Sequence, residues 1–125
     1  MNLNQVTIPS LDLKLSIAFY KQLGLKLIVE SLPAYARLEC PDGEATLSIH
    51  LVKHLPSGDG VILYFECEDV DKEVQKLVES GLHFDELPEQ KVWLWKEARL
   101  KDPDNNQVIL FHAGVNRKYP PWRLT

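Results

Sequence analysis

Apolar and polar side chains alternate along several short stretches of this chain, which predicts β-strands with one buried face. The alternation is clearest in residues 35–40, where Ala36 and Leu38 share one face while Tyr35, Arg37 and Glu39 share the other. Further strands are expected over residues 3–8, 25–30, 46–51, 61–66, 92–101 and 107–112. The turn residues Pro9-Ser10 are expected to end the first of these.

Two stretches instead show helical spacing, at residues 11–23 and 69–81. Asp69 is a suitable N-cap for the second helix, because its carboxylate accepts hydrogen bonds from backbone N–H groups in the first turn. Gly24 and Gly81 follow the two patterns and suit the left-handed conformation that ends many helices.

The chain contains an internal repeat, which indicates two similar modules. The repeated residues lie 57 positions apart: Asp12, Ile17, Gly24 and Leu25 recur as Asp69, Val74, Gly81 and Leu82. We expect one domain over residues 1–125, with module one at 3–55, a linker at 56–60, module two at 61–113 and a tail at 114–125.

Composition narrows the classes of function. The net charge of −4 argues against nucleic-acid binding, which usually needs a basic face. No apolar run has the roughly 20 residues of a membrane span, and no signal peptide is visible, so a cytoplasmic protein without membrane contact is expected. Cys40 and Cys67 lack the spacing of a metal or redox pair and are interpreted as packed thiols.

Four stretches carry a resemblance to the vicinal oxygen chelate superfamily, which includes glyoxalases, extradiol dioxygenases and bleomycin-resistance proteins. They are LNQV at 3–6, the helix LSIAFY closing with LGL at 15–25, YFECEDV at 64–70 and KDPDNN at 101–106. The resemblance implies an α+β fold of two tandem βαβββ modules, whose curved mixed sheets surround a cleft, in a homodimer.

The polar and aromatic strand faces are the candidate lining of that cleft, since a sheet with a helix on one side leaves its other face open. Fourteen residues form this prediction: Gln5, Thr7, Tyr35, Arg37, Ser48, His50, Ile62, Tyr64, Glu66, Trp95, Glu97, Arg99, Ile109 and Phe111.

Enzymes of this superfamily hold a divalent metal with four His, Gln or Glu ligands. By the resemblance these positions fall at Gln5, Ser48, Ile62 and Ile109, although the second can shift because turn lengths differ between modules. Isoleucine offers no donor atom, so we expect no metal and no other cofactor in the usual site. A relocated metal held by His50 with Glu97 or Glu66 is the alternative.

Three functions compete. The first is a protein that binds a small polar or aromatic molecule without metal, as bleomycin-resistance proteins do. The second is a lyase, isomerase or dioxygenase, with His50 as base, Glu97 or Glu66 as partner acid, and Arg37 or Arg99 holding an anion. The third is a structural or regulatory partner that acts through its dimer surface.

Overall fold

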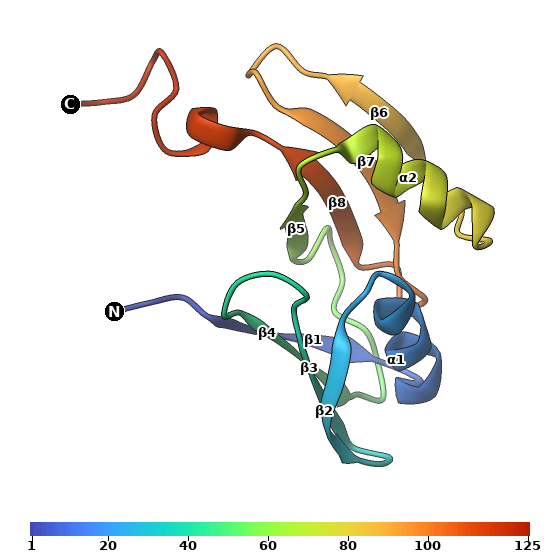
Figure 1. Ribbon diagram of the computed structural model, residues 1–125. Helices are drawn as coiled ribbons and strands as arrows, with labels where there is room; N and C mark the ends of the chain where they lie inside the picture. The colour runs from blue at the N-terminus through green and yellow to red at the C-terminus, as the bar shows by residue number, and fades with distance from the viewer. The chain divides into compact units, whose positions relative to one another are not determined.

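The computed structural model describes all residues 1–125, which divide into two compact units. Unit 1 comprises Met1–Val61 together with Asp102–Asn106, and unit 2 comprises Ile62–Lys101 together with Gln107–Thr125. Each unit contains a four-stranded mixed sheet and one helix (Figure 1). The predicted α+β fold of two βαβββ modules is therefore confirmed.

Unit 1 is built from strands β1, β2, β3 and β4 and the helix α1. Their bounds are β1 Gln5–Ser10, α1 Leu13–Gln22, β2 Lys26–Ser31, β3 Tyr35–Glu39 and β4 Thr46–Leu51. The strand order is β1-β4-β3-β2, with β1 parallel to β4 and the other pairs antiparallel. Helix α1 packs on one face of this sheet over apolar side chains that include Ile8, Leu38 and Ile49, all fully buried.

Unit 2 repeats this plan. Its bounds are β5 Ile62–Glu66, α2 Val70–Glu79, β6 Glu86–Gln90, β7 Lys96–Lys101 and β8 Gln107–His112, followed by a short 3₁₀ turn η1 at Gly114–Arg117. The order β5-β8-β7-β6 matches that of unit 1, again with one parallel pair. Helix α2 packs against β6, β7 and β8, over side chains that include Leu100 and Val108.

The helix ends follow the predicted chemistry. The carboxylate of Asp12 accepts hydrogen bonds from the N–H groups of Lys14 and Leu15, and Asp69 caps α2 through Lys72. Gly24 and Gly81 follow the helices with φ of 102° and 103°, a conformation that side-chain-bearing residues rarely adopt. Neither ten-residue helix is long or apolar enough to cross a membrane.

Two strand predictions are wrong in their limits, and one strand was not predicted. Strand β1 continues through Pro9 to Ser10. Because β1 lies at the edge of its sheet, it tolerates a proline, which has no N–H group to donate to a neighbouring strand. Strand β7 begins at Lys96 rather than residue 92, because Leu94 takes a left-handed conformation in a tight turn. Strand β6 was not predicted, because its charged residues and Pro88 do not alternate with apolar ones.

The turn between β7 and β8, residues 102–106, belongs to unit 1 and holds a buried carboxylate. Asp102 accepts a hydrogen bond of 2.7 Å from the phenol of Tyr20 on α1 and one of 2.8 Å from the Asn106 side chain. Its other oxygen accepts the backbone N–H groups of Asp104 and Asn106, both at 2.9 Å. Burial, and then the charge of Asp102, raise the pKa of Tyr20, so this phenol stays protonated and donates.

Replacing Tyr20 with Phe removes this donor while leaving the ring. We expect the free energy of unfolding to fall by about 1–3 kcal/mol, because a buried charge loses one of its hydrogen bonds. Urea unfolding followed by circular dichroism measures the change. The matched control is Tyr119→Phe, whose phenol is 60% exposed, and it should match wild type. Equal stability of Tyr20→Phe and wild type would contradict this role for Asp102.

Candidate functional site

Unit 1 has an open face of polar side chains on the side of its sheet opposite α1. Alternation along the strands places the predicted residues of module one there, since their neighbours Ile8, Leu38 and Ile49 are buried on the other side. The predicted residues on this face are Gln5, Thr7, Tyr35, Arg37, Ser48 and His50.

Three of these residues form one hydrogen-bonded cluster. The hydroxyl oxygens of Tyr35 and Ser48 lie 2.6 Å apart, and the Arg37 Nε donates to the Tyr35 oxygen at 2.9 Å. The guanidinium carbon lies 5.5 Å from the centre of the Tyr35 ring, within range of a cation–π interaction. The hydrogen bond with Ser48, and then the Arg37 hydrogen bond and charge, lower the pKa of Tyr35. The cluster therefore makes the Tyr35 phenol more acidic than an isolated tyrosine.

The side chains at the four positions that the resemblance assigns to a metal do not form a suitable set of metal ligands. The Gln5 side-chain oxygen accepts a hydrogen bond from Thr46, and the Ser48 hydroxyl is paired with Tyr35. Ile62 and Ile109 carry no donor atom. No group of three or more His, Cys, Asp or Glu side chains is placed to hold a metal ion.

The open face of unit 2 carries a cluster of aromatic rings. Trp95 and Phe111 are stacked with ring centres 4.9 Å apart, and Tyr64 meets both edge-on, at 5.9 Å and 5.5 Å. Phe111 is buried and Trp95 is partly buried, whereas Tyr64 is 47% exposed. This exposed ring stands on a rigid aromatic base, which is an arrangement suited to contact with a planar molecule.

Glu97 is a buried carboxylate on the same face, with only 1% of its surface exposed. One oxygen accepts a hydrogen bond from the Trp93 indole at 2.6 Å, and the other pairs with Arg99 at 3.4 Å. Arg99 also pairs with Glu86 of β6 at 3.4 Å. Both oxygens of Glu97 are therefore engaged inside unit 2, as a buried charge requires.

Glu66 holds the start of the C-terminal segment. One of its oxygens accepts hydrogen bonds from the backbone N–H groups of Ala113 and Gly114, at 2.7 and 2.9 Å. Burial alone would raise the pKa of Glu66, but these hydrogen bonds and the nearby His112 and Arg117 outweigh it and lower the pKa. Glu66 thereby fixes the position of the turn η1.

The predicted catalytic residues belong to different units: His50 lies exposed on β4 of unit 1, and Glu97 lies on β7 of unit 2. A cleft lined by both modules, and a catalytic pair within it, stay predictions. The sequence did not predict that Trp93 and Glu86 would be the partners of Glu97 and Arg99. Trp93 was interpreted as part of a strand, and nothing in the pattern around Glu86 indicated one.

Two surface hollows lie away from both open faces. One, of about 460 Å³, surrounds the start of α2 and is lined by polar side chains that include Asp69, Lys96 and His112. The other, of about 300 Å³, surrounds the start of α1 and is lined mainly by leucines, among them Leu11 and Leu51. None of the fourteen predicted cleft residues lines either hollow.

Comparison with known proteins agrees with the fold. Residues 2–110 match the family model described as Glyoxalase/Bleomycin resistance protein/Dioxygenase superfamily. The protein named "Uncharacterized protein YraH" of Bacillus subtilis (strain 168) is 30% identical over 127 residues, which span 89% of this chain and 98% of that protein.

Two solved structures of proteins with different functions share the fold. Lactoylglutathione lyase from Agrobacterium tumefaciens matches with a TM-score of 0.77 and 16% identity, over 91% of this chain and 95% of that one. A bleomycin-binding protein solved in complex with bleomycin matches with a TM-score of 0.71 and 19% identity, over 90% and 98%. At these identities the likeness shows the fold and leaves the function to the side chains.

Replacing Glu66 with Gln tests the carboxylate that holds η1. We expect a loss of about 1 kcal/mol or less at neutral pH, because this partly exposed group loses charge-assisted hydrogen bonds. Since folding lowers the Glu66 pKa, the stabilisation is present above the ordinary carboxyl pKa and disappears as the pH falls through the folded value. Thermal unfolding should show the two proteins converging below that range.

The control is Glu39→Gln, which removes an exposed carboxylate that lies 4.0 Å from Lys26. Its melting temperature should stay close to that of wild type at every pH. A Glu66→Gln deficit that persists unchanged under acid conditions would contradict the assignment.

Proposed function

Because the chain belongs to the glyoxalase/bleomycin resistance protein/dioxygenase superfamily, we propose that it binds a small molecule with a planar aromatic part. The proposed contact surface is the aromatic cluster of unit 2, formed by Tyr64, Trp95 and Phe111. The observation that carries the proposal is the exposed ring of Tyr64, which stands over two stacked rings on the open face of a sheet.

Exposure and rigidity together support this assignment. A large aromatic ring left 47% exposed forgoes part of the free energy of burial, which a ligand ring would recover. Neighbouring Ile62 is 38% exposed on the same strand and enlarges the apolar area. The Trp95 indole N–H points to the Asn116 carbonyl oxygen at 3.5 Å, so the polar atom of that ring is directed toward protein.

The binding is proposed to need no metal. The positions that the resemblance assigns to a metal carry two isoleucines, a glutamine that is hydrogen-bonded to Thr46 and a serine that is hydrogen-bonded to Tyr35. A bleomycin-binding protein of the same fold supports small-molecule binding as one use of this architecture.

Substituting Tyr64 with Ala should weaken binding of planar molecules by about tenfold, because stacking on one ring is worth on the order of 1 kcal/mol or more. Quinoline, which is neutral at pH 7, and proflavine, which is cationic, serve as probes in titrations followed by NMR. The matched control is Tyr119→Ala, another exposed tyrosine, which should bind both probes like wild type.

Failure of both probes to shift signals of the cluster residues at millimolar concentration would count against this surface as a binding site. Equal weakening by Tyr64→Ala and Tyr119→Ala would also contradict the proposal, because the effect would not be specific to the cluster.

Metal retention tests the other part of the proposal. Protein purified without a metal-affinity tag, incubated with Ni, Zn, Mn or Fe and then desalted, should retain far less than one equivalent, since the donor set is incomplete. Elemental analysis measures the content. Retention of one equivalent per chain would contradict metal-free binding and direct attention to His50, Glu66 and Glu97.

A further inference from the structure

The internal repeat extends to the strands that carry the arginines of the two open faces. Strand β3 reads YARLE at residues 35–39, and β7 reads EARLK at residues 97–101. The register agrees, since Arg37 lies opposite Ser48 on β4 and Arg99 lies opposite Ile109 on β8. Arg37 and Arg99 therefore occupy the same place in the two units.

Arg99 shows what an arginine binds at this place. Its side chain pairs with two carboxylates, Glu97 on its own strand and Glu86 on the neighbouring strand, each at 3.4 Å. The register places Glu86 directly opposite Arg99. Two anions thus surround this cation in unit 2.

Both carboxylates are missing around Arg37. The place of Glu97 is taken by Tyr35, and the place of Glu86, opposite the arginine on the next strand, is taken by Val29. No carboxylate oxygen lies within 4.0 Å of the Arg37 guanidinium, and the nearby Glu39 is paired with Lys26 instead. Arg37 is thus half-buried without an anionic partner, although the chain carries 18 acidic residues.

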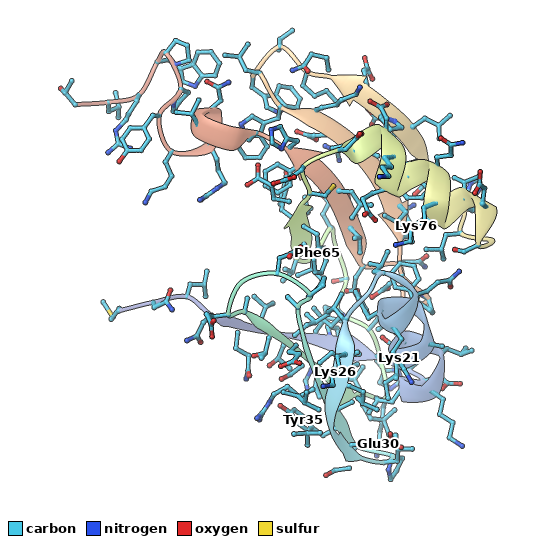
Figure 2. The ribbon with its side chains drawn as sticks, in the orientation of Figure 1. Lys21, Lys26, Glu30, Tyr35, Phe65 and Lys76 are labelled. Carbon is cyan, nitrogen blue, oxygen red and sulfur yellow. The ribbon has the colours of Figure 1, made fainter.

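The Arg37 side chain is nevertheless held in a fixed position. Its Nε donates to the Tyr35 hydroxyl at 2.9 Å, and its guanidinium lies over the Tyr35 ring. The terminal nitrogens have no hydrogen-bond partner in the protein. These N–H groups form a planar fork that matches the geometry of a carboxylate or phosphate. Tyr35, labelled in Figure 2, begins β3 and lies opposite His50, whose exposed imidazole adds a donor on the same face.

We propose that Arg37, held in place by Tyr35, whose hydroxyl is in turn paired with the buried Ser48, forms a binding site for an oxyanion on the open face of unit 1. This site receives the carboxylate or phosphate group of a small ligand. The ligand group supplies to Arg37 the negative charge that Glu86 and Glu97 supply to Arg99. Because Arg37 is pre-positioned by Tyr35, little side-chain freedom is lost on binding. This site is separate in its residues from the aromatic cluster of unit 2, and it does not depend on that cluster binding a ligand.

Titrations of ¹⁵N-labelled protein with inorganic phosphate and with benzoate test the site at constant ionic strength. We expect saturable shifts of the Arg37 Nε signal and of the Tyr35 and Ser48 amides, with a Kd on the order of 1 mM for so small an anion. The tighter of the two anions identifies the group that the site prefers. Benzylamine, a cation of similar size to benzoate, should leave these signals in place.

Arg37→Gln should weaken binding of the better anion at least tenfold, because charged hydrogen bonds dominate the contact. Arg37→Lys should restore only part of it, since an ammonium lacks the planar fork. The control Arg123→Gln makes the same change in net charge at a tail arginine that contacts the Lys118 carbonyl and the Tyr119 ring. It should bind like wild type.

Variants that copy the arrangement of unit 2 keep Arg37 and place a carboxylate beside it. Tyr35→Glu recreates the place of Glu97, and Val29→Glu recreates that of Glu86. Each should abolish anion binding by supplying an internal carboxylate, even though Arg37 is intact. Using both guards against the case in which one of them fails to fold.

The proposal is overturned if neither anion shifts the Arg37 signals, or if Arg37→Gln and Arg123→Gln weaken binding equally. Undiminished binding in a folded Val29→Glu protein would overturn it as well. The Tyr64→Ala protein separates the two proposals, because it should retain wild-type affinity for the anion whatever becomes of its affinity for planar probes.

Discussion

A buried carboxylate is the interaction on which the arrangement of unit 1 depends. Asp102 is only 3% exposed and accepts four hydrogen bonds, from the Tyr20 phenol, the Asn106 side chain and two backbone N–H groups. A buried charge without such partners would cost several kcal/mol. The network joins α1 to a turn more than 80 residues away in the sequence, and Asp104 extends it by accepting the Leu11 N–H at 2.8 Å. Because α1 is held in this way over one face of its sheet, the opposite face is the one left open.

The helix-facing positions and the open positions of the two repeats have diverged to different extents. Between β3 and β7 the buried alanine and leucine are the same, and the arginine between them is also shared, but tyrosine replaces glutamate beside it. Packing explains the first part, since a close-packed interior penalises changes in side-chain volume. Close packing constrains the side chains of the open faces less. One face is therefore polar, around Arg37, and the other is aromatic and charged, around Trp95 and Glu97. Each helix also has a lysine in its last turn, where a cation is favoured by the helix dipole: Lys21 in α1 and Lys76 in α2, both labelled in Figure 2.

The chemistry of this chain therefore has to be sought in its open faces rather than in its fold. A lactoylglutathione lyase and a bleomycin-binding protein share the architecture, although each is under 20% identical to the chain. A metal at the positions that the resemblance assigns to one would require donor atoms where the chain has Ile62 and Ile109. The groups that are present are an exposed tyrosine ring on an aromatic base and an arginine without an anion. They suit recognition of a molecule that has a planar part, an acidic part or both.

The sequence by itself determined the repeat, both helices with their caps, and most of the strands. These features depend on neighbours a few positions apart, so Asp69, Gly24 and Gly81 could be interpreted from local chemistry alone. The alternation in residues 35–39 and 46–51 likewise showed which side chains share a face, because that follows from strand geometry.

Tertiary structure alone decided the pairings within each face. The contact between Tyr35 and Ser48 and the absence of an anion at Arg37 depend on strand register, which brings together residues that the sequence separates. The pairing of Glu97 with Trp93 depends instead on the tight turn before β7, in which Leu94 takes a left-handed conformation. The edge strand β6 and the continuation of β1 through Pro9 were decided in the same way, because hydrogen bonding to a neighbouring strand overrode weak local preferences.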